Sequence, residues 1–183
     1  MNLTNHFLIA MPSLADPNFY QTVTYICAHD AEGAMGIVIN RPMPFGLGAI
    51  LSQMDLESND ARVNDTTIFQ GGPVQQERGF IIHRPVKDWE STIKVTEEIG
   101  VGTSRDILEA ISRGTGPTQI LIALGYAGWG AGQLEREMGE NAWLSGPADL
   151  DVLFQEPAEL RWQKAVTLLG VDLRQLSSYA GHA

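Results

Sequence analysis

The sequence predicts an α+β fold in which three or four helices pack on a mixed, mostly antiparallel β-sheet. Short segments rich in β-branched and apolar residues recur along the 183 residues, and only a few segments have a helical pattern. The two kinds follow one another irregularly, which is neither the strict alternation of a doubly wound α/β fold nor an all-β pattern. Because no linker or repeat divides the chain, we expect a single domain spanning residues 1–183.

The first half of the chain contains three predicted strands. His6–Met11 is short and apolar, as in a buried strand. Thr22–His29 alternates in β-forming residues, and Ala34–Asn40 follows it after the turn signal Asp30–Gly33. These two strands should form a hairpin. The prolines of Arg41–Pro44 are expected to end the hairpin's second strand, because proline cannot donate to a sheet ladder.

Further strands are predicted in the middle of the chain. Thr66–Gln70 and Arg78–Arg84 flank the stretch "GGPVQQE", and Thr92–Thr103 suggests one or two more short strands. Thr118–Gly125 is a nearly continuous apolar run, which is typical of a strand covered on both faces. The chain therefore has about seven predicted strands.

Helical patterns occur at three places. Gly46–Met54 resembles a short helix, and Thr103–Gly114 is the clearest one, with Thr103 as the cap and Asp106 completing a capping box. The last helix is expected from Pro157 to about Leu169. Its predicted buried side consists of Leu160, Ala165, Val166 and Leu169.

The charge and composition limit the function classes. Twelve basic and 22 acidic residues give a net charge of −10, and Leu134–Leu160 alone holds seven acids and one base. Nucleic-acid binding depends on basic residues that neutralise phosphates, so direct binding is not expected. We interpret the acidic region as a solvated surface. With one cysteine, no signal peptide and no apolar run of membrane length, a cytoplasmic protein without membrane contact is expected.

The stretch "LGYAGWGAGQLE", Leu124–Glu135, holds four glycines between a predicted strand and a predicted helix. Backbone N–H groups in such a place bind anions, but the spacing matches neither the dinucleotide fingerprint nor the P-loop. Glu135 and Glu137 in the first helical turns would repel a highly charged ligand. We interpret the stretch as a structural turn, with a neutral or weakly anionic ligand as the alternative. Its candidate binding residues are Gly125, Gly128, Trp129 and Gly130.

Two further motifs lie at predicted strand ends. "GGPV", Gly71–Val74, is interpreted as a stiff connection, with the alternative of a backbone nest that receives a carboxylate or phosphate beside an arginine. "NRP", Asn40–Pro42, is either a strand end with a solvated arginine or an arginine aimed into a cleft. The candidate binding residues of these motifs are Asn40, Arg41, Gly71, Gly72, Pro73 and Arg78.

Catalytic signatures are weak. Cys27 and His29 should project from one face of a strand, about 7 Å apart, which allows a nucleophilic dyad or, with His83, a metal site. The more common role of such a cysteine is that of a small buried hydrophobe. The sequence contains no G-x-S-x-G, H-E-x-x-H or C-x-x-C motif. We therefore expect no cofactor and no metal, and assign no catalytic residue.

Three long segments are similar to one known family. "ADPNFYQTVTYICAHDAEGAMGIVINRP", "FQGGPVQQERGFIIHRP" and "ALGYAGWGAGQLEREMGENAWL" resemble the bacterial YqgE/AlgH family in order and spacing, and the similarity extends over nearly the whole chain. The resemblance implies a single α+β domain in the cytosol and transfers no catalytic residue. It marks the same Asn-Arg and glycine motifs. One branch of the family is called a transcriptional regulator.

Three function hypotheses follow. The first is a non-catalytic binding or interaction module with a small-ligand cleft at the strand-end turns, where Trp129 and Arg41 flank a small molecule or a protein partner. The second is a transcriptional regulator, which rests on the family name alone. The third is an enzyme with an unfamiliar site around Cys27 and His29.

Overall fold

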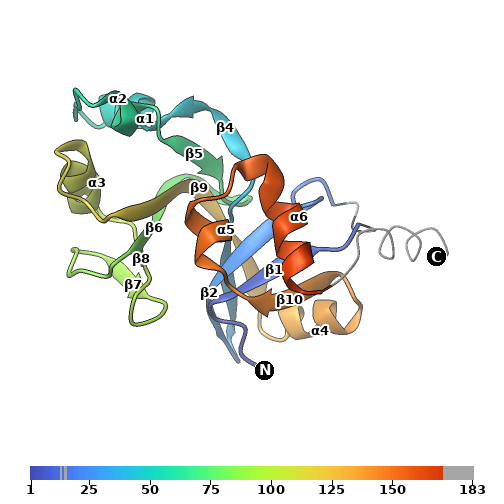
Figure 1. Cartoon of the computed structure of the whole chain (residues 1–183). Helices are drawn as coiled ribbons and strands as arrows, with labels where there is room; N and C mark the ends of the chain where they lie inside the picture. Colours follow the sequence, from blue (N-terminus) through green and yellow to red (C-terminus); the bar gives the residue numbers. More distant parts are fainter. Residues whose placement is uncertain (13, 15, 171–183) are drawn as a thin grey trace.

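The computed structural model describes residues 1–12, 14 and 16–170, and confirms the α+β class. In these ranges ten strands form one curled sheet with six helices around it (Figure 1). The predicted number of three or four helices is wrong. Two of the six, α2 (Ala61–Asn64) and α5 (Leu150–Phe154), have only four and five residues, which is too short for a helical period to show in the sequence.

The strands follow the order β10-β1-β2-β3-β9-β6-β8-β7, and the β4–β5 pair joins this path at β9. Among the pairs of the described ranges, β5 and β9 are parallel and the others are antiparallel. The strands are β1 (His6–Ala10), β2 (Val23–Asp30), β3 (Gly33–Val38), β4 (Pro42–Gly46), β5 (Thr67–Gln70), β6 (Val74–Arg84), β7 (Thr92–Lys94), β8 (Gly100–Gly102), β9 (Gln119–Gly130) and β10 (Trp143–Pro147).

The helices cover the sheet in separate groups. The remaining four are α1 (Leu47–Gln53), α3 (Arg105–Ser112), α4 (Gln133–Gly139) and α6 (Ala158–Leu168). Figure 1 shows α1, α2 and α3 at one end of the molecule and α4 and α6 toward the other. None of the helices within the described ranges is long and apolar enough to span a bilayer.

Three buried clusters hold the layers together. One lies between the sheet and α5–α6, a second includes Leu134 of α4, and a third joins α1 and α3 to strands β5, β6 and β9. Side chains of β9 alternate between two of them, with Leu121 and Ala123 in the first and Ile122 in the third. This two-sided burial confirms the prediction from the apolar run that opens β9.

The prediction of a turn at Gly125–Gly130 is wrong, because β9 continues through these glycines and the chain turns only after Gly130. The first half of β9 pairs with β5 and β6, and its second half pairs with β3. Gly125 has φ +79°, a left-handed value that a non-glycine residue rarely takes in a strand. Gly125 therefore lets one strand join both halves of the sheet.

The segment after the hairpin also differs from expectation. Its prolines were expected only to end a strand. Instead, Pro42–Gly46 forms a strand of its own, β4, which pairs with β5 alone. An edge strand tolerates proline, since its outer side needs no ladder donor. The predicted hairpin itself is confirmed by the antiparallel pairing of β2 with β3.

Two helical details differ as well. The N-cap of α3 is Ser104, not Thr103, and Ile107, Leu108 and Ile111 form the buried face of this helix. On α6, Leu160 was expected to be buried but is 40% exposed, whereas Arg161 is only 6% exposed. The buried arginine connects α6 to the sheet through Ile39 O.

Candidate functional site

The GGP motif and the start of the glycine stretch meet backbone to backbone. Gly71 N–H donates to Leu124 O at 2.8 Å, and Val38 N–H donates to Gly71 O at 2.8 Å. A Cβ on Gly72 would lie 2.2 Å from the Tyr126 backbone, and one on Gly125 would lie 2.5 Å from Gly72 O. The structure thus brings these two motifs together, and the glycines permit the close approach of β9 to the β5–β6 connection.

Asn40 and Arg41 bind backbone groups of the 17–23 segment. Asn40 accepts from Val23 N–H and donates to Gln21 O, both at 2.9 Å. The Arg41 guanidinium donates to three carbonyl oxygens, those of Pro17, Asn18 and Tyr20, at 2.7–3.0 Å. The recess that Arg41 shares with Gly72 and Pro73 has a volume of about 10 Å³, which is room for about one water molecule.

Trp129 lies in the second buried cluster and is 6% exposed. Its indole N–H donates to Glu137 at 3.2 Å, and the indole N–H of Trp143 donates to the same carboxylate oxygen at 3.0 Å. Glu137 was assigned to the acidic surface, but it bridges two tryptophans. Gly128 and Trp129 line an open recess of about 520 Å³ at the β2–β3 hairpin, so Trp129 and Arg41 border different recesses.

Cys27 and His29 do not share a face, contrary to the expectation from strand alternation. A β-bulge between Ile26 and Ala28 adds one residue and shifts the alternation. Cys27 therefore lies in the first cluster, whereas His29 accepts from Leu3 N–H through Nδ1 at 2.9 Å and contacts Glu135 through Nε2. Both ring nitrogens of His29 are thus engaged, and a Cys27–His29 dyad is not formed.

Burial raises the pKa of the Cys27 thiol to about 12, which disfavours the nucleophilic thiolate. We predict that Cys27 reacts with a disulfide reagent at pH 8 about 100-fold or more slowly in the folded protein than in guanidinium, because the fold must open first. The measurement is the rate of reagent release with and without denaturant. Equal rates would contradict the buried position and would revive the enzyme hypothesis.

His83 is fully buried on β6 and pairs Nδ1 with Ile81 O at 3.0 Å. Burial lowers its pKa, so the neutral ring is favoured. In the described ranges no group of three or more His, Cys, Asp or Glu side chains is placed to hold a metal ion. Cys27, His29 and His83 therefore do not form such a group.

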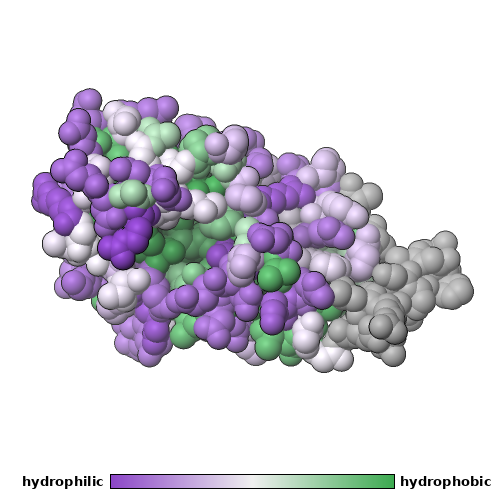
Figure 2. All heavy atoms as spheres, turned by 45° about the horizontal axis from the view of Figure 1, so that its top comes forward, coloured by the Kyte–Doolittle hydropathy of each residue, from purple (hydrophilic) through white to green (hydrophobic). Residues whose placement is uncertain are grey.

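Part of the hydrophobic surface is gathered in one place. Figure 2 shows hydrophobic residues in a hollow near the middle of one face, surrounded by hydrophilic residues. Apolar surface that is collected inside a polar rim is typical of binding sites. Tyr20 and Ile93 are also among the exposed large apolar side chains.

A recess that is more enclosed than the one beside Trp129 lies between helices α1 and α3 and strands β6 and β9. We call it the α1–α3 pocket. Its volume is about 430 Å³, within the range of about 300–1,000 Å³ typical of small-molecule sites. Its apolar lining comes from two helices and two strands: Ile50, Met54, Ile81, Leu108, Ile122 and Leu124. Of the ten predicted binding residues, Arg78 lines this pocket.

The polar side of the pocket is a connected network. Arg78 donates to Thr103 Oγ1 at 3.4 Å, and Thr103 shares a hydrogen bond of 2.9 Å with Ser91. Ser91 N–H donates to Ser104 Oγ at 3.1 Å, and the Ser104 hydroxyl donates to Asp106 at 2.5 Å. These contacts hold the 90–92 segment against the start of α3 and fix the position of the rim.

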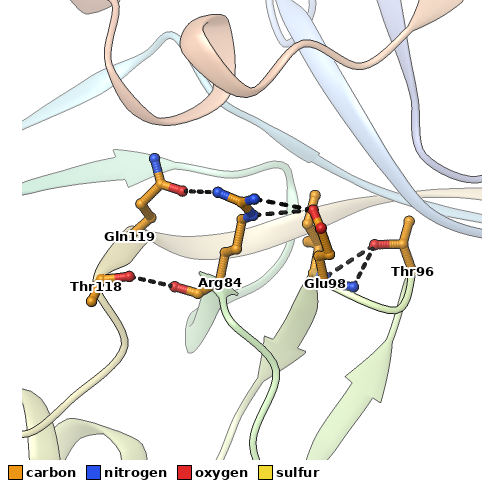
Figure 3. Close-up of polar contacts among 6 residues, drawn as sticks. Arg84, Thr96, Glu98, Thr118 and Gln119 are labelled. Carbon is orange, nitrogen blue, oxygen red and sulfur yellow. Dashed lines mark hydrogen bonds and ion pairs between the residues drawn. The ribbon is translucent and has the colours of Figure 1, made fainter.

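Arg84 offers a contrast on the same strand. Figure 3 shows its guanidinium between Gln119 and Glu98, with distances of 3.0 Å to the amide oxygen and 3.2 Å to the carboxylate. An acid thus neutralises Arg84, whereas the hydrogen-bond acceptors of Arg78 within the described ranges are neutral. This difference makes Arg78 the more available cation of the strand.

Asp106 stabilises the rim in a pH-dependent way. Burial raises its pKa, but hydrogen bonds from the Ser104 hydroxyl and from the Glu90 and Ile107 amides outweigh burial and hold the pKa below its usual 3.8. A lowered pKa means that the carboxylate stabilises the fold above pH 3.8 and loses this effect as the pH falls through the folded-state pKa. We predict that Asp106→Asn costs about 1 kcal/mol at pH 7, or about 2–4 °C in Tm.

The test is a pair of melting curves for wild type and Asp106→Asn between pH 7 and pH 3. The difference in Tm should shrink below pH 4, because the wild-type carboxylate then becomes protonated. A difference that stays constant over this range would show that the charge of Asp106 does not contribute.

The comparisons with known proteins agree with this fold. Residues 7–174 match the model of a family described as AlgH-like. A UPF0301 protein of Thioalkalivibrio sulfidiphilus is 58% identical over 182 residues, which are 100% of this chain and 97% of the relative. A UPF0301 protein of Nitrosococcus oceani is 55% identical over 179 residues, covering 98% and 96%.

Two solved structures are similar over almost the whole length. The solution structure of the AlgH protein from Pseudomonas aeruginosa is 50% identical, with a TM-score of 0.82 and coverage of 100% of this chain and 97% of that one. A crystal structure of a Corynebacterium diphtheriae protein shares only the fold, at 16% identity, a TM-score of 0.72 and coverage of 97% and 91%. By the family model and these relatives, the chain belongs to the AlgH-like family.

Proposed function

We propose that this chain is a non-catalytic binding module that works as a single domain in the cytoplasm and takes a small, largely apolar molecule into the α1–α3 pocket. One observation carries the proposal: a recess of about 430 Å³ combines an apolar lining with a few polar groups on one side. This composition is typical of small-molecule sites, in which apolar surface supplies affinity and a few polar groups fix orientation.

The positions of the motif residues favour this site over the strand-end cleft expected from the sequence. Asn40 and Arg41 bind backbone groups. Gly125 packs against Gly72 O, and Gly72 packs against the Tyr126 backbone. Their contacts stabilise the sheet that carries β6 and β9, whose side chains form the pocket floor. These motif residues thus stabilise the strands that form the pocket but do not line it.

The two other hypotheses have less support. A Cys27–His29 enzyme is disfavoured by the separation of the two side chains on opposite faces of β2. Direct DNA recognition is disfavoured by the net charge of −10, because specific binding at about 10⁻⁸ M or tighter depends on basic contacts to phosphates. A gel-shift titration that reached this affinity at physiological salt would restore the regulator hypothesis.

The test of the proposal is a thermal-shift screen against small metabolites at fixed ionic strength. A ligand at about 100 times its Kd adds about 2.7 kcal/mol, which at this size raises Tm by about 5–11 °C. The shift should disappear in Leu108→Trp, which fills the pocket, and persist in Lys164→Ala on the distant α6. A shift that survives Leu108→Trp would place the site elsewhere, and a flat screen would favour a protein partner.

A further inference from the structure

Gly79 on β6 lies in the floor of the α1–α3 pocket, and no close contact with the described residues requires glycine there. Its φ is not in the left-handed region, and a Cβ built on it would meet no atom within 4 Å. In contrast, a Cβ on Gly71 would lie 2.3 Å from Gly125 O, so packing explains that glycine. A side chain on Gly79 would point into the pocket.

Glycine weakens a strand, and in strand interiors it often marks a place where a ligand comes close to the backbone. Gly79 pairs with Leu124 at the point where the regular β6–β9 ladder resumes after the irregular stretch between Val74 and Gly79. It lies next to the buried Phe80. Because neither conformation nor packing accounts for it, access to the pocket does. The absence of a side chain opens the floor between the two helices.

The walls above Gly79 are apolar and partly adaptable. Ile50 comes from α1, Met54 caps the end of that helix, and Leu108 comes from α3. Ile122 and Leu124 of β9 complete the floor. Methionine fills irregular gaps well because its side chain is unbranched and flexible. A compact hydrocarbon or aromatic body therefore fits between the helices and over the glycine.

The mouth of the pocket carries two cations. The Arg78 guanidinium makes only long contacts, at 3.3 Å to Gln75 and 3.4 Å to Thr103, and its Cζ lies 5.6 Å from the centre of the Phe80 ring. Arg105 on α3 uses its Nε for an ion pair with Glu109 at 2.9 Å. This pairing leaves the terminal nitrogens of Arg105 without a hydrogen-bond partner among the described residues.

The acids at this mouth are Glu77, which lines the pocket, Glu109, which is paired with Arg105, and Asp106, which accepts hydrogen bonds from Ser104 and the Glu90 amide. Two arginines facing one apolar recess are unusual in a chain of net charge −10. An arginine fork binds a carboxylate through two parallel hydrogen bonds. With one lining acid opposing two arginines, a single negative charge suits the mouth better than a phosphate ester with two.

We propose that the ligand is a small amphipathic carboxylate, whose apolar body lies on Gly79 and whose carboxylate binds Arg78 at the mouth, with Arg105 opposite. This inference rests on the proposed function and names the class of its ligand. The Thr103 hydroxyl, which accepts from Arg78, also lies at the rim.

The experiment uses the full chain labelled with ¹⁵N and a matched set of probes: hexanoate, octanoate and 3-phenylpropionate, and the alcohol with the same body for each. Binding is measured from the backbone amide shifts of Gly79 and Leu124 during titrations to millimolar concentration. The acids should bind about tenfold more tightly than the alcohols, because only they form the charge-assisted pair.

Variants separate the two parts of the inference. Arg78→Gln should remove most of the advantage of the acids, and Arg113→Gln, at the far end of α3 from the pocket, should not. Gly79→Val should abolish binding of acids and alcohols alike, and Gly79→Ala, which adds only a methyl group in open space, should weaken it. The amide spectrum of each variant reports whether its fold is intact.

The outcomes are distinguishable. If acids and alcohols bind equally and Gly79→Val abolishes binding of both, the assignment of the ligand as a carboxylate is wrong and the proposed pocket function stands. If the acids bind more tightly but Arg78→Gln leaves that advantage intact, the assignment to Arg78 is overturned. If no probe shifts the pocket amides of the folded wild type, both the inference and the proposed function are overturned.

Discussion

Gly72→Ala is expected to destabilise the protein by about 4 kcal/mol, a fall in Tm of about 8–16 °C. Gly72 has φ +155°, and a Cβ there would lie 2.2 Å from both the carbonyl carbon and the carbonyl oxygen of Tyr126. These are backbone atoms of β9, which cannot rotate away as a flexible side chain can. The methyl group must therefore push the β5–β6 connection away from β9, at the point where the two motifs meet.

The matched control is Gly114→Ala. Gly114 also has a left-handed φ, +79°, but a Cβ there would meet no atom within 4 Å. The control variant carries only the conformational cost, about 1 kcal/mol, or about 2–4 °C in Tm. Both variants are compared with wild type by chemical denaturation and thermal melting. Similar losses for the two would show that close backbone approach at Gly72 does not determine the effect.

Much of the fold was predictable because most strands carry a local signal. The alternation of Thr22–His29 and Ala34–Asn40 predicted the β2–β3 hairpin, and the apolar run at Thr118 predicted the two-sided burial of β9. The continuation of β9 through Gly125–Gly130 was not predictable in the same way. Clustered glycines indicate a turn locally, whereas here Gly125 is needed by its close contact with Gly72 O, which lies far away in the sequence.

The candidate site was less predictable, for a similar reason. The sequence drew attention to motifs rich in glycine and arginine, but Arg41 and Gly72 stabilise the sheet, and an arginine's partners are not visible in its neighbours. A bulge at Cys27 likewise reversed the expected side of His29. One local signal for the pocket was present: Gly79 interrupts the strand pattern of Arg78–Arg84, and an isolated strand glycine indicates close backbone approach.

Arg161 shows why a charged helical residue is hard to place from sequence. Helix α6 was expected to bury Leu160, but the structure turns Arg161 toward the sheet instead. The guanidinium donates to Ile39 O at 2.5 Å and to Glu156 O at 2.9 Å. Its Cζ lies 4.9 Å from the centre of the Phe69 ring. Burial lowers its pKa to about 10, with Glu156 opposing the shift, so the group remains charged at neutral pH.

These contacts connect α6, the end of β3 and the middle of β5, and they offset the cost of burying the charge. Arg161→Ala leaves Ile39 O without its donor and opens a cavity against Phe69. We expect a loss of about 3–4 kcal/mol, or about 6–16 °C in Tm. Arg161→Lys should lose about 2 kcal/mol, because an ammonium group cannot span both carbonyls.

Lys164→Ala, on the exposed side of the same helix, provides the control and should change stability by less than about 0.5 kcal/mol. The three variants are measured by urea denaturation at pH 7. The informative result is a loss of stability that is largest for Arg161→Ala, smaller for Arg161→Lys and smallest for the control. This order separates the loss of the directed hydrogen bonds from the loss of the charge. If Arg161→Lys matched wild type, the charge alone would hold α6, and the two directed hydrogen bonds to Ile39 and Glu156 would not be needed.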